Sequence, residues 1–117
     1  MENHFEPKEH ECKCGCGLQN MNRVHMDMLN QARDLAGIPF VITSGSRCSQ
    51  HNKDEGGRDT SDHLTGEGSD VEVKTSQQRF LILRAAFVAG FRRIGIGKTF
   101  IHLGTNENNP QKVQWLY

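Results

Sequence analysis

The first regular pattern along the chain is a stretch in which apolar residues recur every three or four positions. These residues are Met21, Val24, Met28, Ala32 and Leu35. Such a period predicts a helix with one apolar face. Asn20 is a suitable N-cap for this helix, and Gly37 followed by Pro39 predicts where it ends.

A second helix is predicted over residues 76–89, where the run FLILRAAFVA is apolar on nearly every side. Thr75 or Ser76 is expected to cap its start, and Gly90 is expected to end it. Because this segment has no broad polar face, we expect it to be the central helix of the core.

Short apolar runs predict the strands of one sheet. They cover residues 40–43, 69–74, 91–96, 100–103 and, as an edge strand, 113–117. The order of helices and strands predicts an α+β fold, with a small, mainly antiparallel sheet backed by helices. The length predicts a single domain over residues 1–117, in which residues 1–19 form an irregular, cysteine-rich N-terminal arm.

Charge and hydropathy narrow the classes of partner. Lys plus Arg and Asp plus Glu each number 14, so the formal net charge is +0 and no nucleic-acid or membrane partner is expected. No apolar stretch approaches the length of a membrane span. The N-terminus is polar and lacks a secretory signal, so we expect synthesis in the cytoplasm without a signal peptide. We expect a monomer.

Histidine and aspartate side chains form the most informative pattern. The segment SDHLTGEGSD holds His63 and Asp70, and His102 lies in the predicted strand FIHL. Since a sheet can bring His102 beside Asp70, the three side chains can meet around one ion. Two histidines and one carboxylate, with a fourth position left for water, form the ligand set of a hydrolytic Zn²⁺ site. A single histidine in a strand is more often an ordinary hydrogen-bonded side chain, so this prediction depends on the whole pattern.

Residues 44–62 are polar and too long for a simple connection; their sequence is SGSRCSQHNKDEGGRDTSD. Long ordered segments of this kind often carry function. We therefore expect them to form a loop that makes one wall of the active-site cleft.

The segment SDHLTGEGSD, with SGSRCSQHN upstream and FIHLG downstream, resembles the M15 zinc peptidases. That family contains D-alanyl-D-alanine carboxypeptidases and phage peptidoglycan endopeptidases. The chain is most similar to the short, often phage-encoded branch, whose members open with a cysteine-containing segment (here ECKCGCG) and close near a Trp-x-Tyr (here residues 115–117). The resemblance covers nearly the whole chain and implies a fold like that of the DD-peptidases and the hedgehog signalling domain.

The resemblance also implies roles for individual residues. His63, Asp70 and His102 would be the zinc ligands. Arg47 matches the family arginine that binds the substrate carbonyl or carboxylate, and a guanidinium can donate two parallel hydrogen bonds to such a group. Ser61 matches a family serine near the first ligand and is expected to orient a ligand or the substrate.

The general base is not visible where the family places it. Many members carry a Glu three residues before the last histidine, which is Thr99 here, and some short members carry an Asp two residues after it, which is Gly104 here. Glu72 is the predicted base, because strand alternation places it on the same face as Asp70. For three further candidates a solvated surface role in a mobile loop is expected, namely Asp62, Glu67 and His51.

Two functions therefore remain open at the level of sequence. The first is a zinc metallopeptidase that cleaves peptidoglycan peptides, as a carboxypeptidase or an endopeptidase, in the manner of an endolysin that reaches the bacterial cell wall from the cytoplasm. The second is a non-catalytic zinc module that binds cell-wall peptide or a protein, as the hedgehog domain shows for a similar fold.

The four cysteines also leave alternatives open. Cys12, Cys14 and Cys16 alternate along the arm, and Cys48 adjoins Arg47. They could form a second, structural metal site. They could also supply a disulfide from the arm to Cys48, or remain free thiols.

Overall fold

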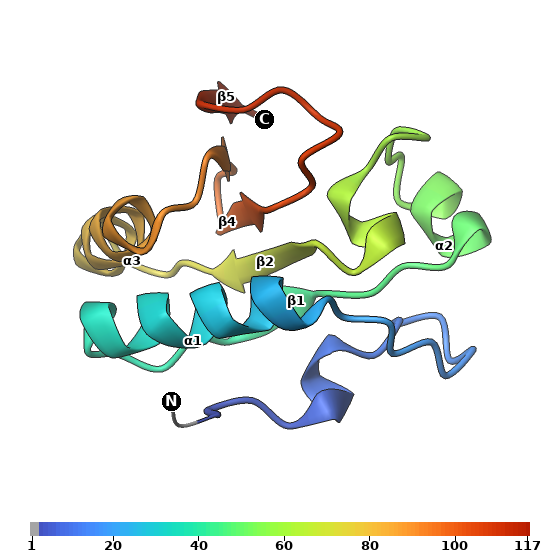
Figure 1. Ribbon diagram of the computed structural model, residues 1–117, viewed down its shortest axis with the longest axis horizontal. Coiled ribbons are helices and arrows are strands. Elements are labelled where there is room, and N and C mark those ends of the chain that lie inside the picture. Colours follow the sequence, from blue (N-terminus) through green and yellow to red (C-terminus); the bar gives the residue numbers. More distant parts are fainter. Residues whose placement is uncertain (1–2) are drawn as a thin grey trace.

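A five-stranded sheet organises the computed structural model, which describes residues 3–117 (Figure 1). The strand order is β1-β2-β4-β3-β5. Neighbouring strands pair antiparallel except β5, which lies at the edge and runs parallel to β3. The strands are β1 (Ile42–Ser44), β2 (Gly68–Glu72), β3 (Arg93–Ile96), β4 (Phe100–Gly104) and β5 (Val113–Leu116). The predicted α+β fold with a mainly antiparallel sheet is confirmed.

Within residues 3–117, three α-helices and two 3-10 helices complete the fold. They are η1 (Pro7–His10), α1 (Arg23–Ala36), α2 (Ser49–Asp54), η2 (Asp62–Thr65) and α3 (Ser76–Ala89). The helices α1 and α3 pack against each other, whereas α2 lies at the opposite end of the molecule from α3 (Figure 1). Among the described residues, no helix has the length and apolar character needed to cross a membrane.

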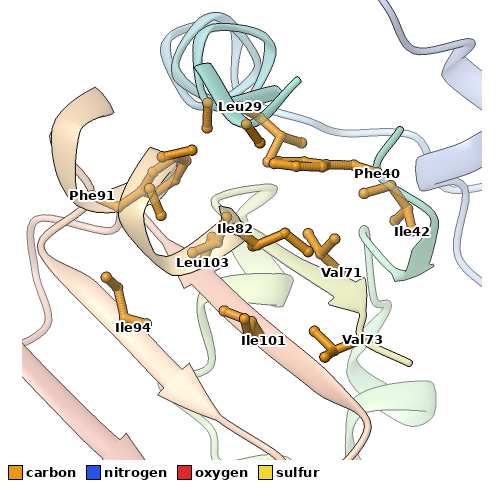
Figure 2. Packing of buried hydrophobic residues seen from close by; sticks show 14 of the residues in the cluster. Leu29, Phe40, Ile42, Val71, Val73, Ile82, Phe91, Ile94, Ile101 and Leu103 are labelled. Atoms are coloured by element: carbon orange, nitrogen blue, oxygen red, sulfur yellow. The ribbon is translucent and has the colours of Figure 1, made fainter. Parts of the chain in front are cut away.

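The core lies between one face of the sheet and the pair α1 and α3. Figure 2 shows Leu29 of α1 and Ile82 of α3 beside Val71 and Leu103 of the sheet. These side chains are at most 1% exposed, and burying each stabilises the fold by about 1.5–3 kcal/mol. Side chains alternate along a strand, so the neighbours of Val71 and Leu103 in sequence point to the other face of the sheet. That face carries the candidate site.

The first helix differs from its prediction. It begins at Arg23, and the side chain of Asn22, rather than Asn20, accepts the N-capping hydrogen bond from the amide of His25 at 2.9 Å. Val24 and Leu35 are exposed, so the predicted apolar face is wrong at these positions. Polar residues occupy part of the buried face instead, because His25 and Asn30 find hydrogen-bond partners inside the protein.

The second helix has the predicted bounds, with Thr75 as N-cap and Gly90 in the left-handed conformation after its end. It is not the central helix of the core. Phe80, Phe87 and Val88 are more than 60% exposed. The reason is the two-layer architecture, in which α3 contacts the sheet and α1 on one side only.

The predicted loop over residues 44–62 contains regular structure. Helix α2 occupies Ser49–Asp54, and η2 begins at Asp62. The N-terminal arm likewise contains η1 and buries Phe5 and Cys12. Helices of four to six residues hold too few turns to show a hydrophobic period, which is why the sequence pattern did not reveal them.

Candidate metal centre

One row of residues crosses all five strands on the face of the sheet opposite the core. The strand register pairs Ser44 with Asp70, Asp70 with His102, His102 with Gly95, and Gly95 with Trp115. The predicted convergence of Asp70 and His102 therefore follows from β-pairing, although they are 32 positions apart in the chain. Trp115 lies beside them, with its ring centroid 5.6 Å from that of His102.

His63 reaches the same place from η2. The hydroxyl of Ser61 caps this short helix by accepting a hydrogen bond from the amide of His63 at 3.2 Å. At the other end Gly66 adopts φ 72°, and a Cβ there would lie 2.0 Å from the carbonyl oxygen of Asn20. A glycine is therefore required for the chain to turn from η2 into β2.

The three predicted ligands converge in space. His63 Nε2 lies 3.2 Å from Asp70 Oδ1, and His102 Nδ1 lies 2.8 Å from the same oxygen. One potential ligand atom from each residue lies within 4.8 Å of the others, and all three residues are buried. Two imidazole nitrogens and one carboxylate oxygen at this spacing fit a zinc ion, so the residues present suit the metal that the pattern predicts.

Hydrogen bonds fix which nitrogen each histidine presents. His63 Nδ1 lies 2.8 Å from the carbonyl oxygen of Gly45, which can only accept, so Nδ1 carries the proton and Nε2 faces Asp70. His102 Nε2 lies 2.7 Å from Asp62 Oδ2 and donates to it, which directs Nδ1 toward Asp70. Partners of this kind orient metal-binding histidines in many proteins.

The charges of the centre are strongly coupled. Burial raises the pKa of the Asp70 carboxyl, but hydrogen bonds with His102 and His63 hold this pKa well below its usual range. Burial lowers the pKa of His102, but its hydrogen bonds to Asp62 and Asp70 raise this pKa above its ordinary value. The ionised carboxylate of Asp70 is the form that a metal ligand requires.

Asp62 is buried, and the expectation of a solvated surface role for it is wrong. Besides His102 it contacts Arg93, whose Nε donates to both carboxylate oxygens at 3.1 Å. The amide nitrogen of Asn109 donates to Oδ1 at 3.1 Å. Burial raises the pKa of Asp62, but these partners, His102 first, keep it below its ordinary value. Asp62 therefore stays ionised because three donors compensate the loss of water.

Two glycines make room for the Asp62 side chain. Gly68 and Gly104 pair across β2 and β4. A Cβ on Gly68 would lie 2.9 Å from the Cβ of Asp62, and one on Gly104 would lie 2.2 Å from Asp62 Oδ2. The carboxylate of Asp62 thus lies where a side chain at position 104 would begin. The pairing of these glycines is visible only in the fold, so the sequence alone did not point to Asp62.

Arg47 lies beside the three predicted ligands. Its Nη2 is 3.6 Å from Asp70 Oδ2, and its Nε donates to the hydroxyl of Ser44 at 3.0 Å. Its Nη1 donates to Asn52 Oδ1 at 3.4 Å. The backbone amide of Arg47 donates to the carbonyl oxygen of His63 at 3.2 Å, so the two segments are joined directly. The guanidinium is therefore held at the edge of the centre.

The proposed base, Glu72, lies two residues beyond Asp70 on the same strand and is about a third exposed, with its carboxylate 3.4 Å from Lys74 Nζ. It contacts none of the three ligands directly and stays a prediction. His51 does not lie in a mobile loop, because it is part of α2. Its Nε2 lies 3.7 Å from Glu55 Oε1. The four cysteines come together in a separate cluster.

A family model for Peptidase M15 matches residues 3–104, which is most of the chain. The chain therefore belongs to the Peptidase M15 family. Membership supports a metallopeptidase, a hydrolase of peptide bonds, and the described residues include groups that could hold its metal ion. No curated protein matches the chain significantly.

Proposed function

We propose that the protein is a zinc metallopeptidase that hydrolyses peptide bonds in peptidoglycan stem peptides or crosslinks. The bond cut would be that of a D-alanyl-D-alanine carboxypeptidase or of a peptidoglycan endopeptidase such as a phage lysis enzyme. The observation that carries the proposal is the buried convergence of His63 Nε2, Asp70 Oδ1 and His102 Nδ1 beside a guanidinium. Family membership supports the reaction class.

His63, Asp70 and His102 would hold the metal. When bound, zinc would polarise the scissile carbonyl and lower the pKa of a water molecule. The protein supplies fixed geometry, since Gly45 orients one imidazole and Asp62 the other. Such preorganisation is what a precise site requires, because ligands held by their neighbours do not reorganise when the ion or substrate binds.

Arg47 would bind a carbonyl oxygen or the terminal carboxylate of the substrate. Its side chain is already held by Ser44 and Asn52, so little conformational entropy is lost when it donates to a ligand. Trp115, close to His102, provides an apolar wall beside the centre. A guanidinium beside Asp70 and an aromatic ring beside His102 suit a peptide that ends in a small D-amino acid, with its carboxylate on Arg47 and its methyl group toward the ring.

Glu72 would act as the general base. Asp62 is less suited to this task, because both of its oxygens accept from Arg93 and one also accepts from His102. Its role would be to position His102. Glu72 is on the same face of the sheet, and its partner Lys74 is largely exposed, so its carboxylate is accessible to a water molecule. Substitution Glu72→Gln tests this role, and an unchanged rate of hydrolysis would remove Glu72 from the mechanism.

One observation favours the alternative, a non-catalytic zinc module that binds cell-wall peptide or a protein. The two positions where relatives of this type carry a base are Thr99 and Gly104 here. If Glu72 cannot replace that base, the centre would bind a peptide without cleaving it. Turnover separates the two functions.

The test is release of new amine termini from purified peptidoglycan. We expect release by the zinc-loaded protein, its loss after chelation, and its recovery when zinc is restored. His63→Ala should abolish it, whereas His4→Ala, which removes a histidine of the N-terminal arm, should not. No release under any metal condition would favour the binding module. We further propose that the protein acts on the bacterial cell wall after crossing the membrane through a lesion made by another agent.

A further inference from the structure

The four cysteines form a cluster at the junction of the N-terminal arm and α2. Cys12 Sγ lies 3.4 Å from Cys14 Sγ, and Cys14 Sγ lies 3.7 Å from Cys48 Sγ. With Cys16, all four sulfur atoms lie within 4.8 Å of one another. All four are free thiols in the structure.

We propose that Cys12, Cys14, Cys16 and Cys48 bind a second zinc ion, in a closed structural site separate from the catalytic centre. Zinc binds four thiolates at about 2.3 Å in a tetrahedron, which places the sulfur atoms about 3.8 Å apart. The distances of 3.4 Å and 3.7 Å between cysteine sulfurs lie just below this value, and all four sulfurs lie within 4.8 Å of one another. A single disulfide would engage two sulfurs and would not explain why the other two approach them.

The backbone of the arm is shaped for this convergence. In an extended strand, alternate cysteines would share a face but stand about 6.8 Å apart along it. Here Gly15 and Gly17 adopt φ 89° and 86°, so the chain curls and directs Cys14 and Cys16 toward one point. Both glycines have left-handed conformations that other residues rarely adopt. The turn therefore has a sequence requirement that free thiols would not explain.

Backbone amides also prepare the sulfur atoms for a metal. The amide of Cys48 donates to Cys12 Sγ, and the amide of His51 donates to Cys48 Sγ, both at 3.4 Å. Such hydrogen bonds hold the two sulfur atoms in place at the cluster. Hydrogen-bond partners orient metal ligands in the same way at other metal sites.

The consequence concerns the segment that carries Arg47. Cys48 follows Arg47 directly, and Cys12 is 36 positions away in sequence. An ion shared by the arm and Cys48 would close this long loop and hold the start of α2 in place. The amide of Ser46 already donates to the carbonyl oxygen of His10 at 2.8 Å, on the same junction. The second zinc would thus fix the strand-to-helix segment on which the substrate-binding guanidinium lies.

The test is the zinc content of the full-length protein, purified under reducing conditions and measured by elemental analysis. We expect two zinc ions per chain in the wild type and one in Cys14→Ser or Cys16→Ser. Asp70→Asn, which alters the other centre, should also lower the content by one, and Lys13→Ser is the matched control in the same turn. Because the side chains of Cys14 and Cys16 are exposed, their replacement should leave folding intact unless a metal is lost.

A second readout does not depend on activity. Cobalt in place of zinc should give the intense thiolate-to-metal charge-transfer absorption of a tetrahedral all-sulfur site, and Cys16→Ser should reduce it, whereas Asp70→Asn should not. One zinc in the wild type that only Asp70→Asn removes would overturn the proposal. A disulfide would also overturn the proposal. It would be seen as an intact mass lower by two hydrogens in protein isolated without reductant, together with no thiolate-to-cobalt absorption after cobalt is added.

Discussion

Asp62→Asn is the substitution that tests the architecture of the predicted metal centre most closely. Asparagine keeps the size of the side chain but removes its charge and one of its two acceptor atoms. Asp62 Oδ2 is 2.7 Å from His102 Nε2, and both of its oxygens accept from Arg93 Nε at 3.1 Å. An amide oxygen in the position of Oδ2 can still accept from both donors, so the substitution removes the negative charge that the histidine and the arginine share. It also places the new amide nitrogen against the amide nitrogen of Asn109, which can only donate.

Two effects set the magnitude. Mutating the carboxylate that orients a metal-binding histidine weakens metal affinity by about 10–100-fold, which corresponds to about 1.4–2.7 kcal/mol. The second effect is on folding, because the Arg93 side chain is 12% exposed and that of Asp62 is 1% exposed. Leaving one partner of a buried ion pair without the other costs about 3–5 kcal/mol when both are fully buried, so we expect about 3 kcal/mol here.

The assay is competition for zinc against a chromophoric chelator, together with urea unfolding of the metal-free protein. Asp59→Asn is the matched control, since Asp59 is exposed and lies three positions before Asp62. We expect the control to match the wild type in both measurements. Wild-type zinc affinity in Asp62→Asn would refute the positioning role, because His102 would then need no carboxylate on its outer nitrogen.

Three further predictions concern neighbouring features. Gly104→Ala would place a methyl group 2.2 Å from the buried Oδ2 of Asp62. We therefore expect the free energy of unfolding, measured with urea, to fall by about 1–3 kcal/mol. Burial, with help from neighbouring charges, lowers the pKa of His10 to about 4 and that of His25 to about 3. Below pH 6.5 the unfolded chain therefore binds more protons than the folded protein. The free energy of unfolding of the metal-free protein should fall by about 2 kcal/mol per histidine between pH 6.5 and 5. The raised pKa of His102 changes stability only above pH 6.5, so it does not oppose this fall. A flat urea profile over this range would contradict it. Arg47→Lys should lower kcat/KM for peptidoglycan peptides by about 100-fold, since lysine cannot reproduce two parallel hydrogen bonds; steady-state kinetics would check this, and a loss below threefold would exclude the role.

The sequence predicted the residues that meet through β-pairing. His102 lies in a clear apolar run and Asp70 in an alternating one, so their shared face follows from strand periodicity. His63 was predicted by its spacing from Asp70 and by the glycines between them. These are local patterns, and local patterns survive folding when the tertiary contacts agree with them.

The role of Asp62 could not be predicted in this way, because its burial depends on Arg93 from β3 and Asn109 from the loop before β5. Neither residue has a spacing that marks it as a partner. The buried His25 of α1 is a similar case. Its ring nitrogens contact Ser69 and Thr105, which lie far away in the sequence, so a polar residue occupies a core position that hydrophobic periodicity leaves to apolar ones.

The position of the metal itself can be measured by anomalous diffraction at the zinc absorption edge, on crystals of the zinc-loaded protein. We expect a peak between the imidazoles of His63 and His102 and the carboxylate of Asp70. A map of fully loaded crystals without a peak at that position, or with the two imidazoles turned away from each other, would contradict the assignment of these residues as the metal centre of the peptidase.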